Sequence, residues 1–142
     1  YDVDSDEADW EQYTSSTPSY GTGPSAAYSG ASYLYLESSY PRVPGDKATL
    51  RSVPLTVSGS VALGFRYNMY GSQMGSLEVT VRRTSEGSAK QVWQRQGDQG
   101  EEWLEASIDL SEYDGSDVEV SFVATVGGGY MSDIAIDDVS FT

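Results

Sequence analysis

The sequence predicts an all-β protein, built as an antiparallel sandwich or a jelly roll. Three observations support this prediction. Apolar and polar residues alternate with a period of two in several short segments, glycine, serine and aspartate separate these segments, and no segment has a convincing helical stripe of apolar residues. The 142 residues fit one domain, 1–142, that can bury a core of its own.

Regular structure is expected to begin late in the chain. Residues 1–9, "YDVDSDEAD", are acidic and have no hydrophobic period. Residues 14–32 are rich in Ser, Gly, Thr and Pro, which predicts a long loop. Loops of this length are uncommon in compact domains and are often functional.

Alternating segments then predict strands at 33–37, 60–71, 76–83, 102–110 and 118–126. In each strand one set of alternate residues is apolar, so this set faces the core and the other set faces outward. The residues expected to be buried on facing sheets are Leu63, Phe65, Val79, Val120, Phe122, Ile134 and Ile136.

The last segment, "DIAIDDVSFT" at 133–142, changes phase in its middle. Ile134 and Ile136 point to one face, whereas the apolar residues after them follow the opposite phase. The slip falls at Asp137 and Asp138, and aspartate is depleted in strand interiors. The simplest physical interpretation is a β-bulge, where paired carboxylates could gather around a cation.

Composition excludes several classes of function. The chain has 22 acidic and 8 basic residues and a net charge of −14, which argues against nucleic acids and anionic membranes as partners. It has no histidine and no cysteine, which excludes disulfides, Ser-His and Cys-His catalysis and the usual zinc ligands. No apolar run is long enough to insert into a membrane.

No enzymatic activity is expected. Paired carboxylates could hydrolyse a glycosidic bond, but the jelly-roll hydrolase pattern Glu-x-Asp-x-x-Glu is absent. The glycine-rich "GGGY" at 127–130 lacks the lysine and the helix of a phosphate loop. It predicts a turn that needs either positive φ or a close approach of two backbones.

Four blocks, in order along the chain, resemble the MAM domain family, named after meprin, the A5 protein and receptor protein tyrosine phosphatase mu. The blocks are "ADW" at 8–10 with "TGP" at 22–24; "YLYLESS" at 33–39; "LGFRYNMYGSQMGSLEV" at 63–79; and "VWQRQGDQGEEWLEASIDL" at 92–110 leading to "GGGYMSDIAIDDVSF" at 127–141. The resemblance implies a jelly-roll β-sandwich of two antiparallel sheets. It also implies a non-catalytic adhesion or interaction module of a secreted or cell-surface protein, and hence an extracellular location.

The chain departs from the family pattern in two informative places. The usual cysteines are absent, and Ala62 stands where many members have one. The family also has an opening strand that pairs close to the closing one, and the eight residues before Asp9 do not easily supply it, so this first strand is expected to be missing. Strand donation from another chain or a cleaved segment is one hypothesis. A short substitute strand within residues 1–8, or an open edge guarded by charge, are the alternatives.

The resemblance and the acidic residues together predict a structural Ca²⁺ site, since some members of the family bind a cation near the closing Asp-Asp strand. Calcium takes 6–8 oxygen ligands. The candidate ligands are Asp137, Asp138, Asp9, Asp6, Asp4 and Glu37. For the N-terminal run alone, a solvated acidic segment is the simpler interpretation.

Aromatic residues give a second candidate site. Trp93, Trp103 and Tyr28 could stack on sugars, which would make the chain a carbohydrate-binding module instead of a protein-contact module. The simpler interpretation of the two tryptophans is that they pack on the sandwich. An aromatic-lined groove would favour a glycan partner, whereas a polar, flat face would favour a protein partner at the cell surface.

Overall fold

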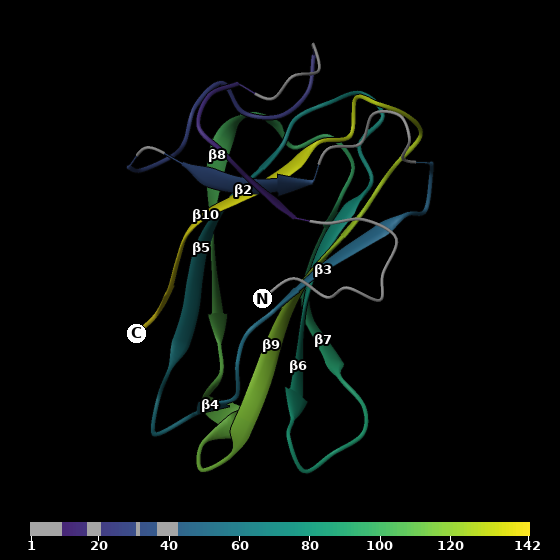
Figure 1. Ribbon diagram of the computed structural model, residues 1–142. Coiled ribbons are helices and arrows are strands. Elements are labelled where there is room, and N and C mark those ends of the chain that lie inside the picture. Colours follow the sequence, from purple (N-terminus) through teal and green to yellow (C-terminus); the bar gives the residue numbers. More distant parts are fainter. Residues whose placement is uncertain (1–9, 17–20, 31, 37–42) are drawn as a thin grey trace.

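Two antiparallel sheets pack face to face in the computed structural model, which describes residues 10–16, 21–30, 32–36 and 43–142 (Figure 1). The β5 sheet has the order β1-β2-β10-β5-β8, with β1 Glu11–Tyr13, β2 Tyr33–Leu36, β10 Ile134–Phe141, β5 Ala62–Met69 and β8 Gly100–Asp109. The β9 sheet has the order β3-β9-β6-β7, with β3 Lys47–Arg51, β9 Asp117–Thr125, β6 Ser76–Arg83 and β7 Lys90–Gln96. The short β4, Leu55–Thr56, also pairs with β9, and a 3₁₀ turn, Ser111–Tyr113, follows β8. The predicted jelly-roll β-sandwich is confirmed.

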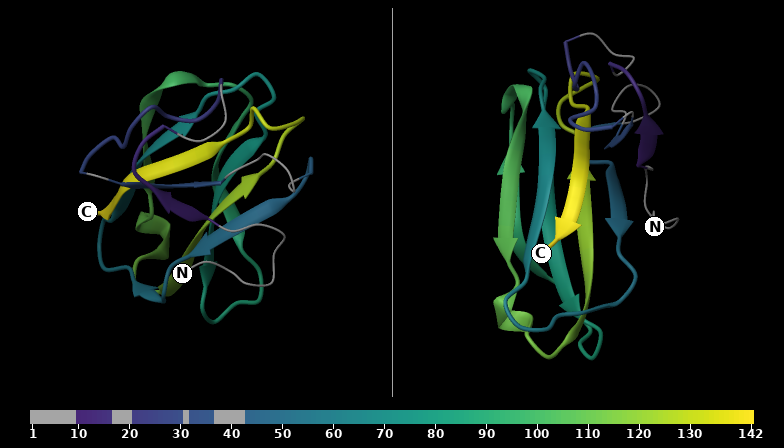
Figure 2. Two further views of the ribbon diagram at one scale, coloured as in Figure 1. Left: turned by 45° about the horizontal axis from the view of Figure 1, so that its top comes forward. Right: turned by 90° about the vertical axis from the view of Figure 1, so that its left-hand side faces the viewer.

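The core lies between the two sheets, which form separate layers in Figure 1, whereas the right-hand view of Figure 2 looks onto the β5 sheet. All seven residues predicted to be buried are at most 5% exposed. Phe65 of β5 and Phe122 of β9 meet edge to face across the core, with ring centroids 5.1 Å apart and planes at 89°. This arrangement joins the two layers at their centre, and aromatic pairs of this geometry add to the stability gained by burial.

The closing strand β10 lies inside the β5 sheet, between β2 and β5. Its pairing with β2 covers only Ile134–Ile136, while its pairing with β5 continues to Phe141. The register with β5 shifts between Asp137 and Ser140, so β10 carries one residue more than its partner there. The predicted bulge is confirmed, and it explains why the apolar residues after it follow the opposite phase.

Aspartate fits this bulge because of its backbone conformation. Asp138 has φ of 54°, and it is the only non-glycine residue with positive φ in the part of the chain that is described. Asp tolerates the left-handed region better than most residues, since its short side chain can bond to nearby backbone. The Asp138 amide donates to Oδ1 of Asp137 at 2.8 Å. The two adjacent acidic residues are therefore the local cause of the bulge.

Four strands were not predicted from the sequence: β1, β3, β4 and β7. Three of them are only 2–5 residues long, which is too short for alternation to be distinctive. The seven-residue β7 is mostly polar and exposed, and its register with β6 shifts between Val79 and Thr80, which breaks its alternation. Within the described residues no helix is long and apolar enough to cross a membrane.

Candidate functional site

The two carboxylates of the β10 bulge converge on one serine. The backbone N–H of Ser29 donates to Oδ2 of Asp137 at 3.1 Å, and its hydroxyl donates to Oδ1 of Asp138 at 3.4 Å. Ser29 belongs to the loop 21–30, so the bulge anchors this loop to the sheet. A hollow of about 220 Å³ lies beside the bulge, and Gln12 and Ser32 contribute to its wall.

The polar groups at the bulge include the carboxylates of Asp137 and Asp138 and the hydroxyl of Ser32, and oxygen atoms of these kinds are ligands for a hard cation such as Ca²⁺. Among the residues that the structure describes, no group of three or more Asp, Glu, His or Cys side chains could hold a metal ion. The other four predicted ligands, Asp9, Asp6, Asp4 and Glu37, lie outside the described residues. Calcium binding therefore stays a prediction.

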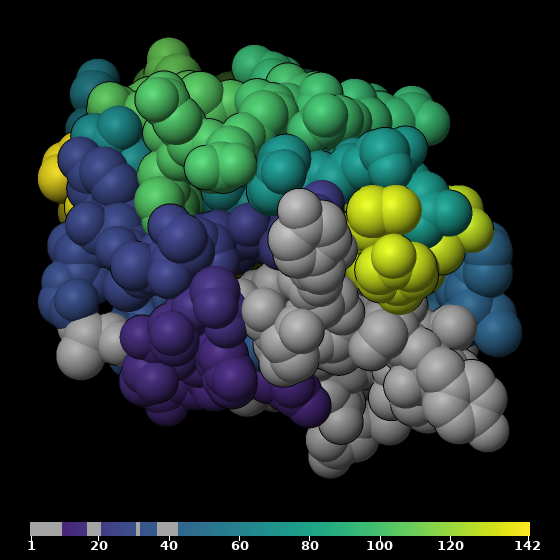
Figure 3. Space-filling model, turned by 90° about the horizontal axis from the view of Figure 1, so that it is seen from above, coloured from purple at the N-terminus to yellow at the C-terminus, as the bar shows by residue number. Residues whose placement is uncertain are grey.

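The predicted stacking residues lie in three different places. Trp93 on β7 faces the core and contacts the rings of Phe65 and Tyr67, each at a centroid distance of 5.0 Å. Trp103 on β8 lies on the outer face of the β5 sheet, and its indole N–H donates to the carbonyl of Ala26 at 2.8 Å. This contact places it against the loop 21–30, which lies beside β8 when the molecule is seen from above (Figure 3).

Tyr28 is the third predicted stacking residue. It is 43% exposed, and the guanidinium of Arg66 lies over its ring at 4.3 Å from the centroid. One face of the Tyr28 ring is thus taken by an arginine. The three aromatic residues do not form one platform, so a shared sugar-stacking surface has no geometric support.

Trp103 instead belongs to an aromatic cluster on the outer face of the β5 sheet, together with Tyr13, Tyr33 and Tyr35. The cluster packs against the loop 21–30 and includes a residue of the edge strand β1. The Trp103 ring meets Tyr33 at a centroid distance of 5.8 Å, and Tyr33 and Tyr35 are each 2% exposed. Tyr33 donates its hydroxyl hydrogen to the carbonyl of Ser15. Burial, with smaller contributions from the charges of Tyr13 and Asp133, raises the pKa of Tyr33 to about 12. This part of the outer face of the β5 sheet is therefore covered.

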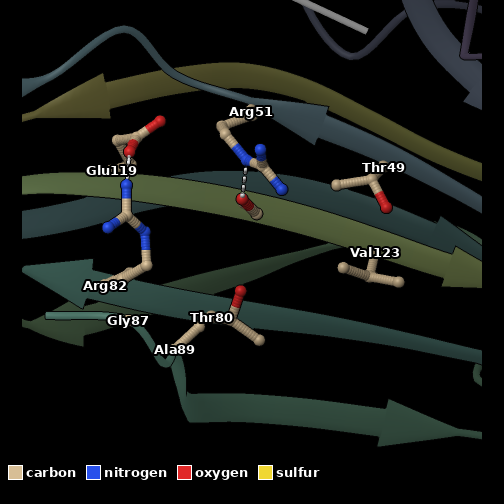
Figure 4. A pocket seen from close by; sticks show the side chains of 9 residues that line it. Thr49, Arg51, Thr80, Arg82, Gly87, Ala89, Glu119 and Val123 are labelled. Carbon is tan, nitrogen blue, oxygen red and sulfur yellow. Dashed lines mark hydrogen bonds and ion pairs between the residues drawn. The ribbon is translucent and has the colours of Figure 1, made fainter. Parts of the chain in front are cut away.

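The outer face of the β9 sheet is different, because a polar hollow of about 390 Å³ opens on it (Figure 4). We call this the β9 hollow. Its wall comes from outward-facing residues of β3, β9 and β6 and from the β6–β7 connection: Thr49, Arg51, Thr80, Arg82, Gly87, Ala89, Glu119, Ser121 and Val123. The volume falls within the range usual for small-ligand sites, although the wall is more polar than is typical.

Strand register brings the polar groups of the β9 hollow together. Arg51 is opposite Ser121 in the β3–β9 pair, and Ser121 is opposite Thr80 in the β9–β6 pair. The three side chains therefore form a row across neighbouring strands, which are about 4.8 Å apart. The Nε of Arg51 donates to the Ser121 hydroxyl at 3.3 Å, which orients its guanidinium (Figure 4).

The second arginine of the hollow is held by an acidic partner. Arg82 forms an ion pair with Glu119, its register neighbour on β9, and its Nη1 donates to the carbonyl of Glu86 at 2.6 Å. The Glu119 side chain is 14% exposed, so this pair is better shielded than a free surface pair. Two arginines and one glutamate give the lining residues a charge of +1, against −14 for the whole chain.

Sequence reasoning did not find the β9 hollow. The alternation of 76–83 correctly places Thr80 and Arg82 on the outward face. The order β3-β9-β6 joins these residues to Arg51 and Ser121, and nothing local in the sequence encodes that order. The signal that was available is Arg82, one of only eight basic residues, on an outward position of a predicted strand; β3, which carries Arg51, was not predicted.

Fold and site together define a class of protein: an antiparallel β-sandwich module with an open polar sheet face. Comparison with known families then identifies the chain. The profile described as "MAM domain, meprin/A5/mu" matches residues 1–142, and the chain belongs to the MAM domain family. The resemblance seen in the sequence is confirmed.

Two curated relatives show how close this similarity is. MAM domain-containing protein 2 of Homo sapiens is 38% identical over 135 residues, which cover 93% of this chain and 19% of the relative. MAM domain-containing glycosylphosphatidylinositol anchor protein 2 of Mus musculus is 32% identical over 154 residues, which cover 96% of this chain and 16% of the relative. The chain thus spans less than a fifth of the length of these two relatives.

Solved structures with the same fold are adhesin and carbohydrate-binding domains. The K1 cleaved adhesin domain of Lys-gingipain from Porphyromonas gingivalis W83 matches with a TM-score of 0.67 and 18% identity, covering all of this chain and 88% of that one. The TmCBM61 module in complex with β-1,4-galactotriose matches with a TM-score of 0.59 and 14% identity, covering 94% of this chain and 87% of that one. At these identities the likeness shows the fold alone.

Proposed function

We propose that this domain is a non-catalytic, extracellular adhesion module of a larger secreted or cell-surface protein, and that it binds its partner through the β9 hollow. The observation that carries the proposal is the contrast between the two outer faces. The loop 21–30 and the aromatic cluster cover part of the β5 face, whereas the β9 hollow opens on the other face. The names of relatives that carry a glycosylphosphatidylinositol anchor support the extracellular location.

An adhesion assay with a blocked hollow tests this proposal. Beads coated with the domain are allowed to settle on cultured cells, because many copies on a bead reveal contacts that are weak singly. Gly87→Trp places an indole on the rim of the hollow, at an exposed glycine where an added Cβ meets nothing within 4 Å. Gly128→Trp is the matched control, since Gly128 is exposed and its nearest contact is Gln73 Cβ at 3.8 Å.

Adhesion should be lost with Gly87→Trp and kept with Gly128→Trp. If both variants adhere like the wild-type domain, the β9 hollow is not the binding face. If wild-type beads adhere no better than beads coated with an unrelated β-sandwich, the adhesive function itself is refuted.

We also propose that Ca²⁺ stabilises the domain at the β10 bulge, with Asp137 and Asp138 among its ligands. Their convergence on Ser29, which brings two carboxylates together beside a hollow, supports this proposal. A ligand present at 100 times its dissociation constant adds about 2.7 kcal/mol to the free energy of unfolding. In a domain of this size this raises the melting temperature by roughly 5–10 °C.

Thermal melts in EDTA, in millimolar Ca²⁺ and in millimolar Mg²⁺ test the calcium site. The wild-type domain should melt higher in Ca²⁺ than in the other two solutions, and Asp137→Asn should melt alike in all three. Equal melting temperatures for the wild type in EDTA and Ca²⁺ would remove the calcium proposal and leave the adhesive function untouched.

Strand addition at β10 is a second mode of partner binding. Beyond Ile136, no strand in the described part of the chain pairs with the edge of β10 that faces β2, and Val139 and Phe141 are 43% and 41% exposed. Such an edge can accept a strand from another chain or a separate segment. A larger mass in light scattering, reduced by Val139→Lys, would support strand addition by a second copy. A monomer that captures no extended segment would refute it.

A further inference from the structure

The outer edge of β8 can accept another strand. β8 is the last strand of the β5 sheet, and no strand in the described part of the chain pairs with its second edge. The right-hand view of Figure 2 shows β8, in green, along the border of this sheet. A strand edge of ten residues presents a row of backbone donors and acceptors to an extended chain.

Hydrogen bonding within the sheet fixes which backbone groups lie on this edge. The amide of Leu110 donates to the Val61 carbonyl at 2.8 Å, whereas Ala62 exchanges hydrogen bonds with Thr142 on the β10 side. In an antiparallel ladder these two kinds of residue alternate. The residues of β8 opposite Ala62, and opposite every second residue of β5 after it, therefore direct their N–H and C=O groups away from β5. They are Asp109, Ser107 and Glu105, and all three are exposed.

The edge strand of the other sheet, β7, is protected in a way that β8 is not. Lys90 and Arg95 of β7 are opposite Val81 and Leu77 of β6, which are buried in the core. The two basic side chains therefore point to the inner face of their sheet. Inward-pointing charges at an edge oppose the addition of a strand. The inward positions of β8 are instead apolar, at Leu104, Ala106 and Ile108.

A hollow of about 340 Å³ lies between β7 and β8, and we call it the edge hollow. Val92, Trp93 and Ile108 contribute apolar surface to it. The ion pair between Lys90 and Glu112, with an Nζ–Oε1 distance of 3.3 Å, also belongs to its wall. A strand added to β8 turns alternate side chains toward this hollow, where apolar side chains are removed from water.

The other alternate side chains of an added strand lie on the outer face, beside acidic groups. β8 has four acidic residues and no basic one. Of these, Glu105 and Asp109 are on the outer face, opposite Arg66 and Ala62. Glu105 is paired with Arg66 at 3.1 Å, yet its side chain is 65% exposed, so it can also contact a cation on an added strand. The outer face of this edge thus suits basic side chains.

We propose that the β8 edge binds an extended segment of a partner protein in which apolar and basic residues alternate. Backbone hydrogen bonds to Glu105, Ser107 and Asp109 provide affinity, and the two kinds of side chain provide specificity. A second copy of β8 does not fit, because two such edges would bring like charges together. This site is separate from the β9 hollow, since the two hollows share no lining residue.

Isothermal titration with designed octapeptides, capped at both ends, tests the proposal. The main probe alternates lysine and valine, and a rearranged probe of the same composition has four lysines before four valines. Two further probes alternate glutamate with valine and lysine with serine. The main probe should bind with a dissociation constant below about 1 mM, and the other three should bind at least about tenfold more weakly. The rearranged probe separates strand recognition from the general attraction of a cation to a chain of charge −14.

Two glutamate variants locate the site. Glu105→Gln should weaken binding of the main probe about threefold, the size of effect usual for an exposed ion pair. Glu11→Gln is the matched control, because Glu11 is exposed on β1, at the opposite edge of the same sheet. It removes the same charge and should leave binding unchanged.

Amide hydrogen exchange, followed by NMR on the wild-type domain, shows which edge the probe occupies. Exchange at Ser107 and Asp109 should slow when the main probe binds, because their N–H groups become hydrogen-bonded. Exchange at Val139 and Phe141, on the edge of β10, should stay the same. Slowed exchange at β10 instead of β8 would assign the peptide to the other edge and overturn the inference.

Three further results would overturn it. These are no binding of the main probe at about 10 mM, equal binding of the rearranged probe, or equal losses in Glu105→Gln and Glu11→Gln. Gly87→Trp should bind the main probe as the wild type does, and a loss in this variant would place the peptide in the β9 hollow. The adhesive function proposed for the β9 hollow and the peptide site at β8 can therefore fail separately.

Discussion

A single methyl group at Gly127 should destabilise this fold strongly. Gly127 follows β9 and crosses the segment before β6 so closely that an added Cβ would lie 2.0 Å from the carbonyl oxygen of Gln73 and 2.5 Å from the amide nitrogen of Gly75. Real Cβ atoms essentially never come within 3.0 Å of another heavy atom, so at least 1.0 Å of backbone movement is required. The obstacle is main chain, which cannot rotate away as a side chain can.

Hydrogen bonds at the crossing resist this movement. The hydroxyl oxygen of the buried Ser132 accepts from the N–H groups of both Gly75 and Gly127, each at 2.9 Å, and Gly128 donates to the Gln73 carbonyl at 2.8 Å. Overpacking costs about 1–3 kcal/mol, and losing one of these bonds adds roughly 1 kcal/mol. Gly127→Ala should therefore lower the free energy of unfolding by about 2–4 kcal/mol and the melting temperature by roughly 10 °C.

Gly128→Ala is the matched control, because its Cβ would meet only the Gln73 side chain, at 3.8 Å, and its φ is not positive. Replacing glycine where the backbone allows it changes stability by less than about 1 kcal/mol. Urea unfolding followed by tryptophan fluorescence measures both variants. If Gly127→Ala lies within 1 kcal/mol of Gly128→Ala, the close crossing is not there and the reasoning is refuted.

Three further predictions concern the core, the aromatic cluster and the bulge. Phe122→Ala should cost about 3–5 kcal/mol in urea unfolding, since it removes a core ring that packs on Phe65; a cost below about 1 kcal/mol would contradict the strand phase. The pKa of Tyr33 is raised, so the folded state holds this proton more tightly, and the contribution of Tyr33 to stability should be constant below pH 10 and be lost as the pH rises from 10 toward 12. Tyr33→Phe should remove this loss of stability between pH 10 and 12. Identical pH profiles of stability for the wild type and the variant would contradict the prediction. Asp138→Val should be about 1–2 kcal/mol less stable than Asp138→Gly, because only glycine adopts positive φ freely. Equal stabilities of the two variants would show that residue 138 does not have positive φ and that the bulge lies elsewhere.

The sequence predicts those parts of the fold that are encoded locally. Alternation assigns faces along β5, β6 and β9, and the phase slip locates the bulge at Asp137 and Asp138. The "GGGY" segment left two readings open, and the structure decides for close backbone approach, because φ is not positive at Gly127. The polar strand β7 was missed because an extra residue in its pairing with β6 interrupts the alternation.

The candidate site was harder to predict because it depends on contacts between distant strands. Arg51 and Ser121 are 70 residues apart in the chain and adjacent in the sheet. Their neighbourhood follows from the order β3-β9-β6, which reflects packing of the whole sandwich. Trp93 and Trp103 both pack against other aromatic rings, which is the simpler of the two interpretations that the sequence allowed for them.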